Sequence, residues 1–536
     1  MYVQEITELR RQGELSKAFE LAYNAWDRDK ADPFLQMSLF WVLRDMCYRF
    51  FKHGYFEEVD VCLKEMKAFL PTMLDEKDMG KQAFKALYHS VQCGAEIILP
   101  ALRLSRERPK DAFFQIEHFI AFPRFFDPLL REDLGWIMYR YLKEILYDIP
   151  SDEAKKLLEA YVALENPRPS LLHSQMLNYC IKFAKEHLDF KLYHFLQLWD
   201  PKLFREKDFQ SHVYTEHVVP SLLERLVKQL VENNEPFRFE ELAQSIVYPK
   251  HKLLELFRRA QYRRIVQFKH WQQQGNMLQA FKDYSTFNRE QGPSTWHSRT
   301  LKLALWYLRG NCAAFFLDFF KVWSYRNFGE EDWRASYDKE DWRASYDKAD
   351  HRQEALVTLV LQRCHDLLSC QRNKQGHFDW YANFLAQYMF RFPENKEAVR
   401  YQALLYHWQQ KDDCAIILFK QLLRQTPDKH HLWYEAAQCL KDNIDARIIF
   451  LCKLLYAQPE ETLLGNTRLT LAQALIRKGM MPAAKAELEY YLQNHHSKSY
   501  IARRLMASIP AKTIANDSNQ DLYRYYAQYA EDLLND

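Results

Sequence analysis

The chain has 536 residues, and its 74 lysines and arginines nearly balance its 71 aspartates and glutamates, which leaves a formal charge of +3. Only 12 residues are glycine, against about 7% in average proteins, and no two glycines lie closer together than Gly80 and Gly94. The dinucleotide fingerprint, the phosphate loop and the nucleophile elbow need glycines a few residues apart, so the sequence excludes them. The near-neutral charge gives no global case for binding nucleic acid.

The distribution of apolar residues and cysteines predicts the cellular setting. No uncharged apolar stretch reaches the roughly 18 residues of a membrane-spanning helix, and the first residues are charged, unlike a secretion signal. The ten cysteines include no Cys-x-x-Cys pair, which favours a reducing compartment. We therefore expect a cytoplasmic protein that has no membrane contact and no cofactor.

Apolar residues recur at intervals of three and four along almost the whole chain, which predicts an all-α fold. Residues 1–100 carry the signature of two helical hairpins, each with a glycine followed by small or apolar residues at helical spacing. The positions are Gly13, Ala18, Ala22 and Ala25 in the first hairpin and Gly54, Val59, Leu63, Met66 and Pro71 in the second.

Residues 101–390 are expected to form irregular helical repeats, and they contain the strongest local cluster of positive charge, at 252–269. The candidate partner-binding residues of this basic segment are Arg258, Arg259, Tyr262, Arg263, Arg264 and Lys269. On a helix, Arg259 shares a face with Arg263. The favoured interpretation is that the arginines pair with acids on neighbouring repeats. Binding of an acidic protein segment and of nucleic acid phosphates or bases are the alternatives.

A tandem copy interrupts this region, since residues 331–339 are repeated without change at 340–348. Nine residues correspond to about 2.5 helical turns, so inside a helix the second copy would face the opposite way. The duplication therefore predicts an exposed surface loop at about 329–352. The alternative is a functional motif in which Trp333 and Trp342 act as twin anchors.

The repeats are clearest at 391–515, before a predicted terminal helix at 516–536. Pro393 and Pro427 are about one tetratricopeptide repeat (TPR) length apart, and Ala415, Phe419 and Pro427 fit the end of the TPR signature. Further matches are Ala446, Phe450, Pro459, Ala472, Leu475, Gly479, Ala484 and Leu488. Small residues of this kind sit where two helices cross, and large ones fill the space between repeats. The expected architecture is a TPR-like helical-repeat α-solenoid.

No arrangement of residues predicts catalysis or metal binding. Cys364, His365, Cys370 and His377 fall close together in the sequence, but they do not have the spacing of a zinc site. We therefore assign no catalytic and no metal-binding residues and do not expect an enzyme.

The segment from Phe315 to Trp333 resembles a stretch in a family of bacterial TPR-containing proteins linked to conflict systems of the TOTE type, which have primase-like partners. Two further segments are similar to that family, one near Glu5 and one that begins at His431. In the family, the helical part is usually followed by a cold-shock or OB-like β-domain. Here residues 521–536 resemble the helix before that domain, so nucleic-acid binding by such a domain does not carry over.

These observations favour a non-catalytic scaffold or adaptor. Stacked helical hairpins offer an extended concave face, on which we expect a protein partner to bind. The resemblance implies a role in bacterial antiphage defence or mobile-element conflict. The alternatives are an accessory protein that binds nucleic acid through residues 252–269 and, third, an enzyme without a recognisable motif.

Overall fold

The computed structural model describes most of the chain, and its secondary structure is helical apart from one short β-hairpin. This confirms the predicted all-α helical-repeat class. No helix in the described ranges combines the length and the apolar character needed to cross a bilayer. The described residues are 2–69, 79–121, 126, 128–166, 169–198, 204–214, 217–235, 237–246, 248–289, 292–334, 354–370, 375–457, 464–494 and 499–535.

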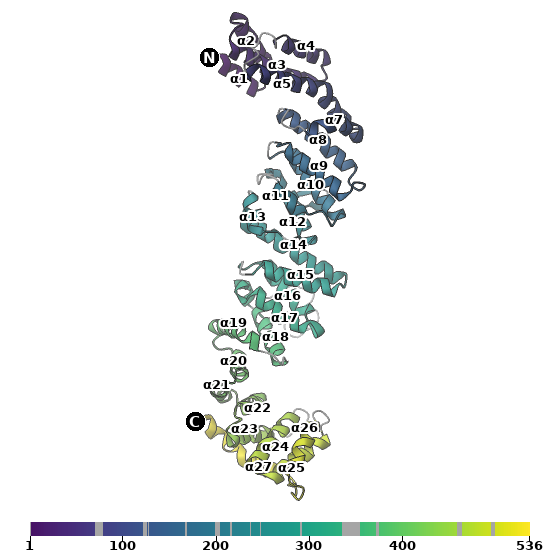
Figure 1. Ribbon diagram of the computed structural model, residues 1–536. Coiled ribbons are helices and arrows are strands. Elements are labelled where there is room, and N and C mark those ends of the chain that lie inside the picture. The colour runs from purple at the N-terminus through teal and green to yellow at the C-terminus, as the bar shows by residue number, and fades with distance from the viewer. Residues whose placement is uncertain are drawn as a thin grey trace. The chain divides into compact units, whose positions relative to one another are not determined.

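Contacts divide the chain into two compact units, Met1–Gln273 and Gln274–Asp536, whose helices are labelled in Figure 1. The sequence analysis divided the chain differently, by how regular its repeats are, into residues 1–100, 101–390, 391–515 and 516–536. That division remains a prediction. The first unit consists of α1 (Tyr2–Arg11), α2 (Leu15–Arg28), α3 (Pro33–His53), α4 (Phe56–Phe69), α5 (Met79–Cys93), the π-helix η1 (Gly94–Ile98), α6 (Leu99–Leu104), α7 (Pro109–Ile120), α8 (Pro128–Glu144), α9 (Ser151–Ala163), α10 (Leu171–Glu186), α11 (Leu192–Leu198), the 3-10 helix η3 (Glu206–Phe209), β1 (His212–Tyr214), β2 (His217–Val219), α12 (Leu222–Glu232), α13 (Phe239–Ser245) and α14 (Lys250–His270).

The second unit contains both the irregular repeats after residue 274 and the regular C-terminal ones. Its elements are α15 (Gln274–Phe287), α16 (Thr295–Tyr307), η4 (Gly310–Cys312), α17 (Ala313–Trp323), η5 (Tyr325–Asn327), η6 (Glu330–Trp333), α18 (Leu356–Cys370), η8 (Gln375–His377), α19 (Phe378–Arg391), α20 (Lys396–Trp408), α21 (Asp412–Gln425), α22 (His430–Cys439), α23 (Ile444–Ala457), α24 (Gly465–Lys478), α25 (Met481–Asn494), α26 (Ser499–Ala507), α27 (Gln520–Ala527) and α28 (Ala530–Asn535).

Several residues that the sequence assigns to the N-terminal hairpins lie at helix ends or in the core. Gly54 ends α3 in the left-handed conformation (φ 85°, ψ 16°), which glycine adopts without steric cost. Ala18 and Ala22 of α2 are fully buried, as expected where α1, α2 and α3 pack closely. The predicted residue Pro71 lies outside the described part of the chain.

Alternate helices in the middle region begin at unequal intervals, as α8 at 128, α10 at 171 and α12 at 222 show. Side-chain hydrogen bonds between helices recur at sequence separations of 34 to 36 residues in both units. That separation is about the length of one TPR. Examples are Arg140 with Ser105, Tyr139 with Gln175, Arg259 with Glu224, Ser298 with Asp332 and Arg400 with Glu435.

A buried polar tether fastens the turn η3 to helix α10 in the first unit. Ser174 Oγ donates to Asp208 Oδ2 over 2.5 Å, and the backbone N–H of Arg205 donates to the same oxygen over 2.9 Å. At the residue before Ser174, Tyr161 Oη and His173 Nδ1 share a hydrogen bond of 2.8 Å.

The second unit repeats this tether between η6 and α16. Ser298 Oγ donates to Asp332 Oδ2 over 2.9 Å, and the backbone N–H of Gly329 donates to that oxygen over 2.9 Å. Tyr284 and His297 form the matching hydrogen bond, at 2.9 Å. Because the serine and the aspartate are 34 residues apart in both copies, the tethers indicate an internal duplication that the sequence analysis did not detect.

The pKa values of the two buried aspartates, Asp208 and Asp332, are shifted in opposite directions. Burial by itself raises the pKa of both carboxyl groups. At Asp208 the hydrogen bonds from Arg205 and Ser174 outweigh burial, so the pKa lies below the ordinary value. At Asp332, where Gly329 stands in place of the arginine, burial prevails and the pKa is raised.

The predicted loop at 329–352 is described only as far as residue 334, and in this first part Asp332 and Trp333 are buried while Glu330, Glu331 and Arg334 are exposed. Trp333 is 6% exposed, and the Arg391 guanidinium lies 4.6 Å from its ring centroid. Glu330 binds Arg391 through both carboxylate oxygens, at 3.0 and 2.7 Å. The rest of the loop and the predicted anchor Trp342 lie outside the described residues.

In the C-terminal repeats the predicted packing residues are core residues. Ala415, Phe419, Phe450, Ala472, Leu475, Ala484 and Leu488 are fully buried, and Ala446 is 5% exposed. The predicted residue Pro459 is not among the described residues. The expected terminal helix is two short helices, α27 and α28, and α27 packs on α23 beside α24 and α25 (Figure 1).

Candidate functional site

The basic segment 252–269 lies on α14, and much of its positive charge is used within the first unit. Arg258 is only 2% exposed and forms an ion pair with Glu255 over 2.5 Å. Arg259 lies 3.5 Å from Glu224 of α12. One of these acids, Glu255, lies on α14 itself and the other, Glu224, on a neighbouring helix, so part of the positive charge is neutralised within the first unit.

The remaining members of the segment leave one exposed arginine. Arg264 donates to the Asn234 side chain over 2.9 Å and lies against the Phe268 ring. Tyr262 and Lys269 are half-buried and also interact within the chain. Arg263 is exposed, as is Lys252 at the start of the segment, and Arg263 lies near the partly exposed Arg259.

Several buried cysteines have a raised thiol pKa, which is the opposite of what a nucleophilic cysteine needs. Burial raises the pKa of Cys47 to about 12, that of Cys62 to about 11 and that of Cys439 to about 12. A thiol with such a pKa stays protonated at neutral pH and reacts poorly. In the rejected cluster at 364–377, Cys364 is buried, and His365 stacks on Tyr401 with ring centroids 3.9 Å apart.

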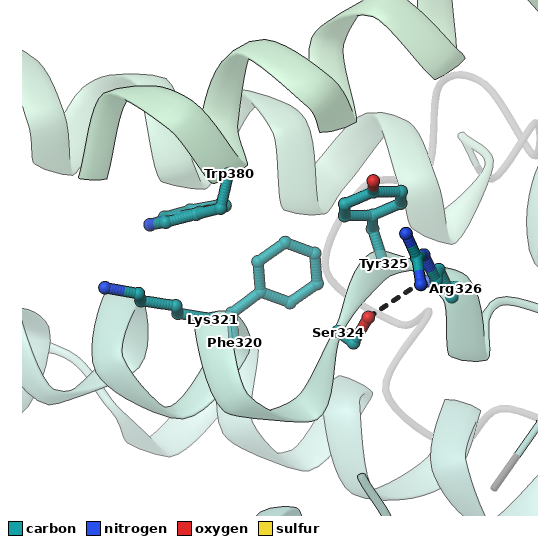
Figure 2. A pocket seen from close by; sticks show the side chains of 6 residues that line it. All are labelled: Phe320, Lys321, Ser324, Tyr325, Arg326 and Trp380. Atoms are coloured by element: carbon teal, nitrogen blue, oxygen red, sulfur yellow. Dashed lines mark hydrogen bonds between the residues drawn. The ribbon is translucent and has the colours of Figure 1, made fainter. Parts of the chain in front are cut away.

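A small open pocket lies in the second unit, where α17, η5 and α19 meet (Figure 2). Its volume is about 170 Å³. Figure 2 shows the Phe320 ring between Trp380 on one side and Tyr325 on the other, with the charged side chains farther out. The lining residues are Phe320, Lys321, Ser324, Tyr325, Arg326 and Trp380.

Aromatic packing holds the walls of this pocket in place. The Phe320 and Trp380 rings meet edge to face at 5.7 Å, and Tyr325 stacks on Phe384 at 6.0 Å. Trp380 Nε1 donates to His377 Nδ1 over 3.2 Å. Burial, aided by Lys321, lowers the pKa of His377 against the opposing effect of Asp318, so its ring stays neutral and Nδ1 can accept this hydrogen bond.

Two cations border the aromatic walls. Lys321 Nζ donates to the Gly376 carbonyl oxygen over 3.2 Å, and its side chain remains exposed. Arg326 is also exposed, and its guanidinium has no hydrogen bond or ion pair with a described residue. An apolar or aromatic side chain flanked by carboxylates therefore matches the pocket in both shape and charge.

The turn that carries three of the lining residues, Ser324, Tyr325 and Arg326, is strained. Ser324 has φ 71° and ψ 128°, a conformation that costs a residue with a side chain about 1–3 kcal/mol. The buried Asn327 holds the turn, because its Nδ2 donates to the carbonyl oxygens of Trp323 and Asn288. Strain of this kind persists where the surroundings fix the backbone, and it is concentrated at functional sites.

Comparisons with known proteins give a family match over part of the chain. A family described as a domain of unknown function (DUF7017) matches residues 400–530, less than half of the sequence. The comparison with curated proteins gives no significant match.

Several solved structures resemble the chain weakly. The crystal structure of yeast Tom70 has 13% identity and a TM-score of 0.26, over 95% of this chain and 94% of that one. Naa15/Naa10 bound to HypK-THB has 13% identity and a TM-score of 0.19, over 99% and 75% of the two chains. A circular tandem repeat protein with a novel repeat topology has 10% identity and a TM-score of 0.12, over 99% and 89%. With TM-scores this low, none of these likenesses carries an argument about function.

Proposed function

We propose that the protein is a non-catalytic scaffold that holds a protein partner, and that the pocket lined by Trp380 anchors a segment of that partner. The observation that carries this proposal is the pocket itself, an aromatic-walled site with two exposed cations on a backbone that is held under strain. Aromatic and arginine side chains in such a position are typical anchors of protein interfaces.

The pocket selects the chemistry of the segment. A ring or a branched apolar side chain enters between Trp380 and Tyr325, over Phe320, and displaces water from apolar surface. Carboxylates on either side of that residue approach Lys321 and Arg326. The partner segment is therefore acidic and contains one large apolar residue.

The sequence resemblance to TPR proteins of bacterial conflict systems supports the proposal of a role in defence against mobile elements. Binding of nucleic acid through residues 252–269 is the weaker alternative, because Arg258, Arg259 and Arg264 are engaged within the first unit.

The experiment compares Trp380→Ala with Trp306→Ala, a change at a tryptophan of the same unit that is 50% exposed. Proteins that co-purify with the full chain are identified, and the affinity of the purified partner is measured for each variant. Loss of an anchor residue costs at least about 2 kcal/mol, so we expect Trp380→Ala to weaken binding more than about tenfold. Trp306→Ala leaves the affinity within about twofold.

A second pair of variants tests the charges. Lys321→Glu weakens binding of the same partner and makes it insensitive to salt, whereas Lys282→Glu at another exposed lysine of this unit does neither. Equal affinities for Trp380→Ala and Trp306→Ala contradict the proposed anchor. Retention of single-stranded RNA or DNA in place of a protein favours the alternative.

A further inference from the structure

Three side chains of metal-binding types meet at the ends of three successive helices in the C-terminal repeats. His407 lies in the last turn of α20, Asp412 is the first residue of α21, and Cys439 is the last residue of α22. One ligand atom from each lies within 4.8 Å of the others. Among the described residues, this group brings together a thiol, an imidazole and a carboxylate.

The site is partly enclosed. The Cys439 side chain is 7% exposed, and those of His407 and Asp412 are 19% and 27% exposed. His407 Nδ1 and Asp412 Oδ1 lie 2.5 Å apart, so the imidazole and the carboxylate already face each other. Asp412 is the most exposed of the three residues.

The ligand set fits Zn²⁺. This ion binds thiolate sulfur at about 2.3 Å and imidazole nitrogen or carboxylate oxygen at about 2.0–2.2 Å, in a tetrahedron. Those distances place tetrahedral ligand atoms about 3.3–3.6 Å apart. Opening the His407–Asp412 contact by about 1 Å through side-chain rotation, and drawing Cys439 inward, satisfies that geometry.

A hydrogen bond and a lysine border the three proposed ligands. Cys439 Sγ donates to the Glu435 carbonyl oxygen over 3.6 Å. Lys441 Nζ lies 3.6 Å from Asp412 Oδ2. A divalent cation supplies the positive charge that the carboxylate and a deprotonated thiol require, and it displaces the lysine from Asp412.

We propose that His407, Asp412 and Cys439 form a site for Zn²⁺, with a water molecule as the fourth ligand. The bound ion joins the end of α20, the start of α21 and the end of α22, and so fastens two successive repeats. Binding converts the Cys439 thiol to a thiolate and releases its proton to solvent, so affinity rises with pH. The proposal is independent of the partner pocket and departs from the sequence analysis, which assigned no metal-binding residue.

The test uses the full chain after treatment with a chelator. Co²⁺ is added first, because a thiolate bound to Co²⁺ gives an intense near-ultraviolet charge-transfer band, and Zn²⁺ is then added to displace it. We expect one equivalent of Co²⁺ to produce the band and one equivalent of Zn²⁺ to remove it. Cys439→Ser abolishes the band, and Asp412→Asn weakens Zn²⁺ binding by more than about 100-fold, since changes outside the ligand shell already cost 10- to 100-fold.

Cys414→Ser is the matched control, because Cys414 is an exposed thiol near the start of the same helix α21. It keeps the band and the affinity of the unchanged protein. Zn²⁺ also raises the unfolding temperature of the unchanged protein and of Cys414→Ser, but not that of Cys439→Ser. Absence of the band, or its loss in Cys414→Ser with retention in Cys439→Ser, overturns the proposal.

Discussion

Replacing Glu487 by alanine is expected to destabilise the C-terminal repeats by about 3–5 kcal/mol, the usual cost of leaving a buried charge without its partner. Glu487 is 1% exposed and Arg468 is 8% exposed, and their side chains form an ion pair of 2.9 Å. The same carboxylate accepts hydrogen bonds from the Tyr523 hydroxyl and, over 2.6 Å, from Asn519 Nδ2. Its removal therefore leaves the buried Arg468 guanidinium without its ion-pair partner and removes the hydrogen bonds that hold the start of α27.

Hydrogen exchange of α23–α25 in the full chain, together with the urea midpoint of the same unit, measures this effect. Glu489→Ala is the control, because the Glu489 side chain is 45% exposed and lies 3.8 Å from Lys485, a pair that contributes less than about 1 kcal/mol. Equal losses in the two variants would show that the buried network does not hold the C-terminal helices.

The replacement Arg205→Gly is expected to change the pKa of Asp208 from below its ordinary value to above it. Arg205 Nη2 lies 2.9 Å from Asp208 Oδ1, and this contact holds the pKa of Asp208 below its ordinary value. The variant reproduces the arrangement at Asp332, where Gly329 leaves burial to raise the pKa. At neutral pH the change costs about 1–3 kcal/mol, because a buried acceptor loses its strongest donor.

Through Asp208, the free energy of unfolding therefore depends on pH in opposite ways in the two proteins. In the unchanged protein the pKa is lower in the folded state, so Asp208 stabilises the fold above its unfolded pKa, and that stability is lost as the pH falls through the folded value. In the variant the folded pKa is the higher one, so burial of the charged carboxylate destabilises the fold above it and acidification removes the cost.

Urea unfolding of the full chain at several pH values, with hydrogen exchange of α10 and η3 to follow the first unit, tests this prediction. We expect the difference in free energy of unfolding between the unchanged protein and Arg205→Gly to become smaller as the pH falls. Lys207→Gly, which changes an exposed residue of the same turn, keeps the pH dependence of the unchanged protein. A difference that stays constant with pH contradicts the assigned role of Arg205.

The sequence predicts the C-terminal repeats well because small and large residues recur there at one repeat length. Ala415 and Phe419 are buried as expected, and helical periodicity alone reveals which face they occupy. The helices of the middle region are unequally spaced, and the sequence analysis missed the polar tether that occurs there twice. Two short motifs in the sequence could have revealed the duplicated tether. Ser-x-x-His-Ser begins at Ser170 and again at Ser294. Phe-x-x-x-Asp follows each copy at the same spacing, beginning at Phe204 and at Phe328.

The sites were harder to predict because their parts are far apart in the sequence. Spacing on one helix could not show that Glu224, on another helix, neutralises Arg259. The pocket joins Lys321 and Arg326 to Trp380 across the contact of η5 and α17 with α19, and its strained backbone at Ser324 has no signature in a residue type. Each of these features depends on tertiary contacts rather than on local pattern.

The account rests on the pocket as a place where a protein partner binds, and photo-crosslinking in the native cell tests that most directly. A benzophenone side chain replaces Lys321 at the rim of the pocket or, as the control, the exposed Lys282. We predict one protein crosslinked at position 321 and not at 282, joined through an acidic segment with a large apolar residue. Crosslinking to nucleic acid, the same products at both positions, or no product at position 321 would contradict the account.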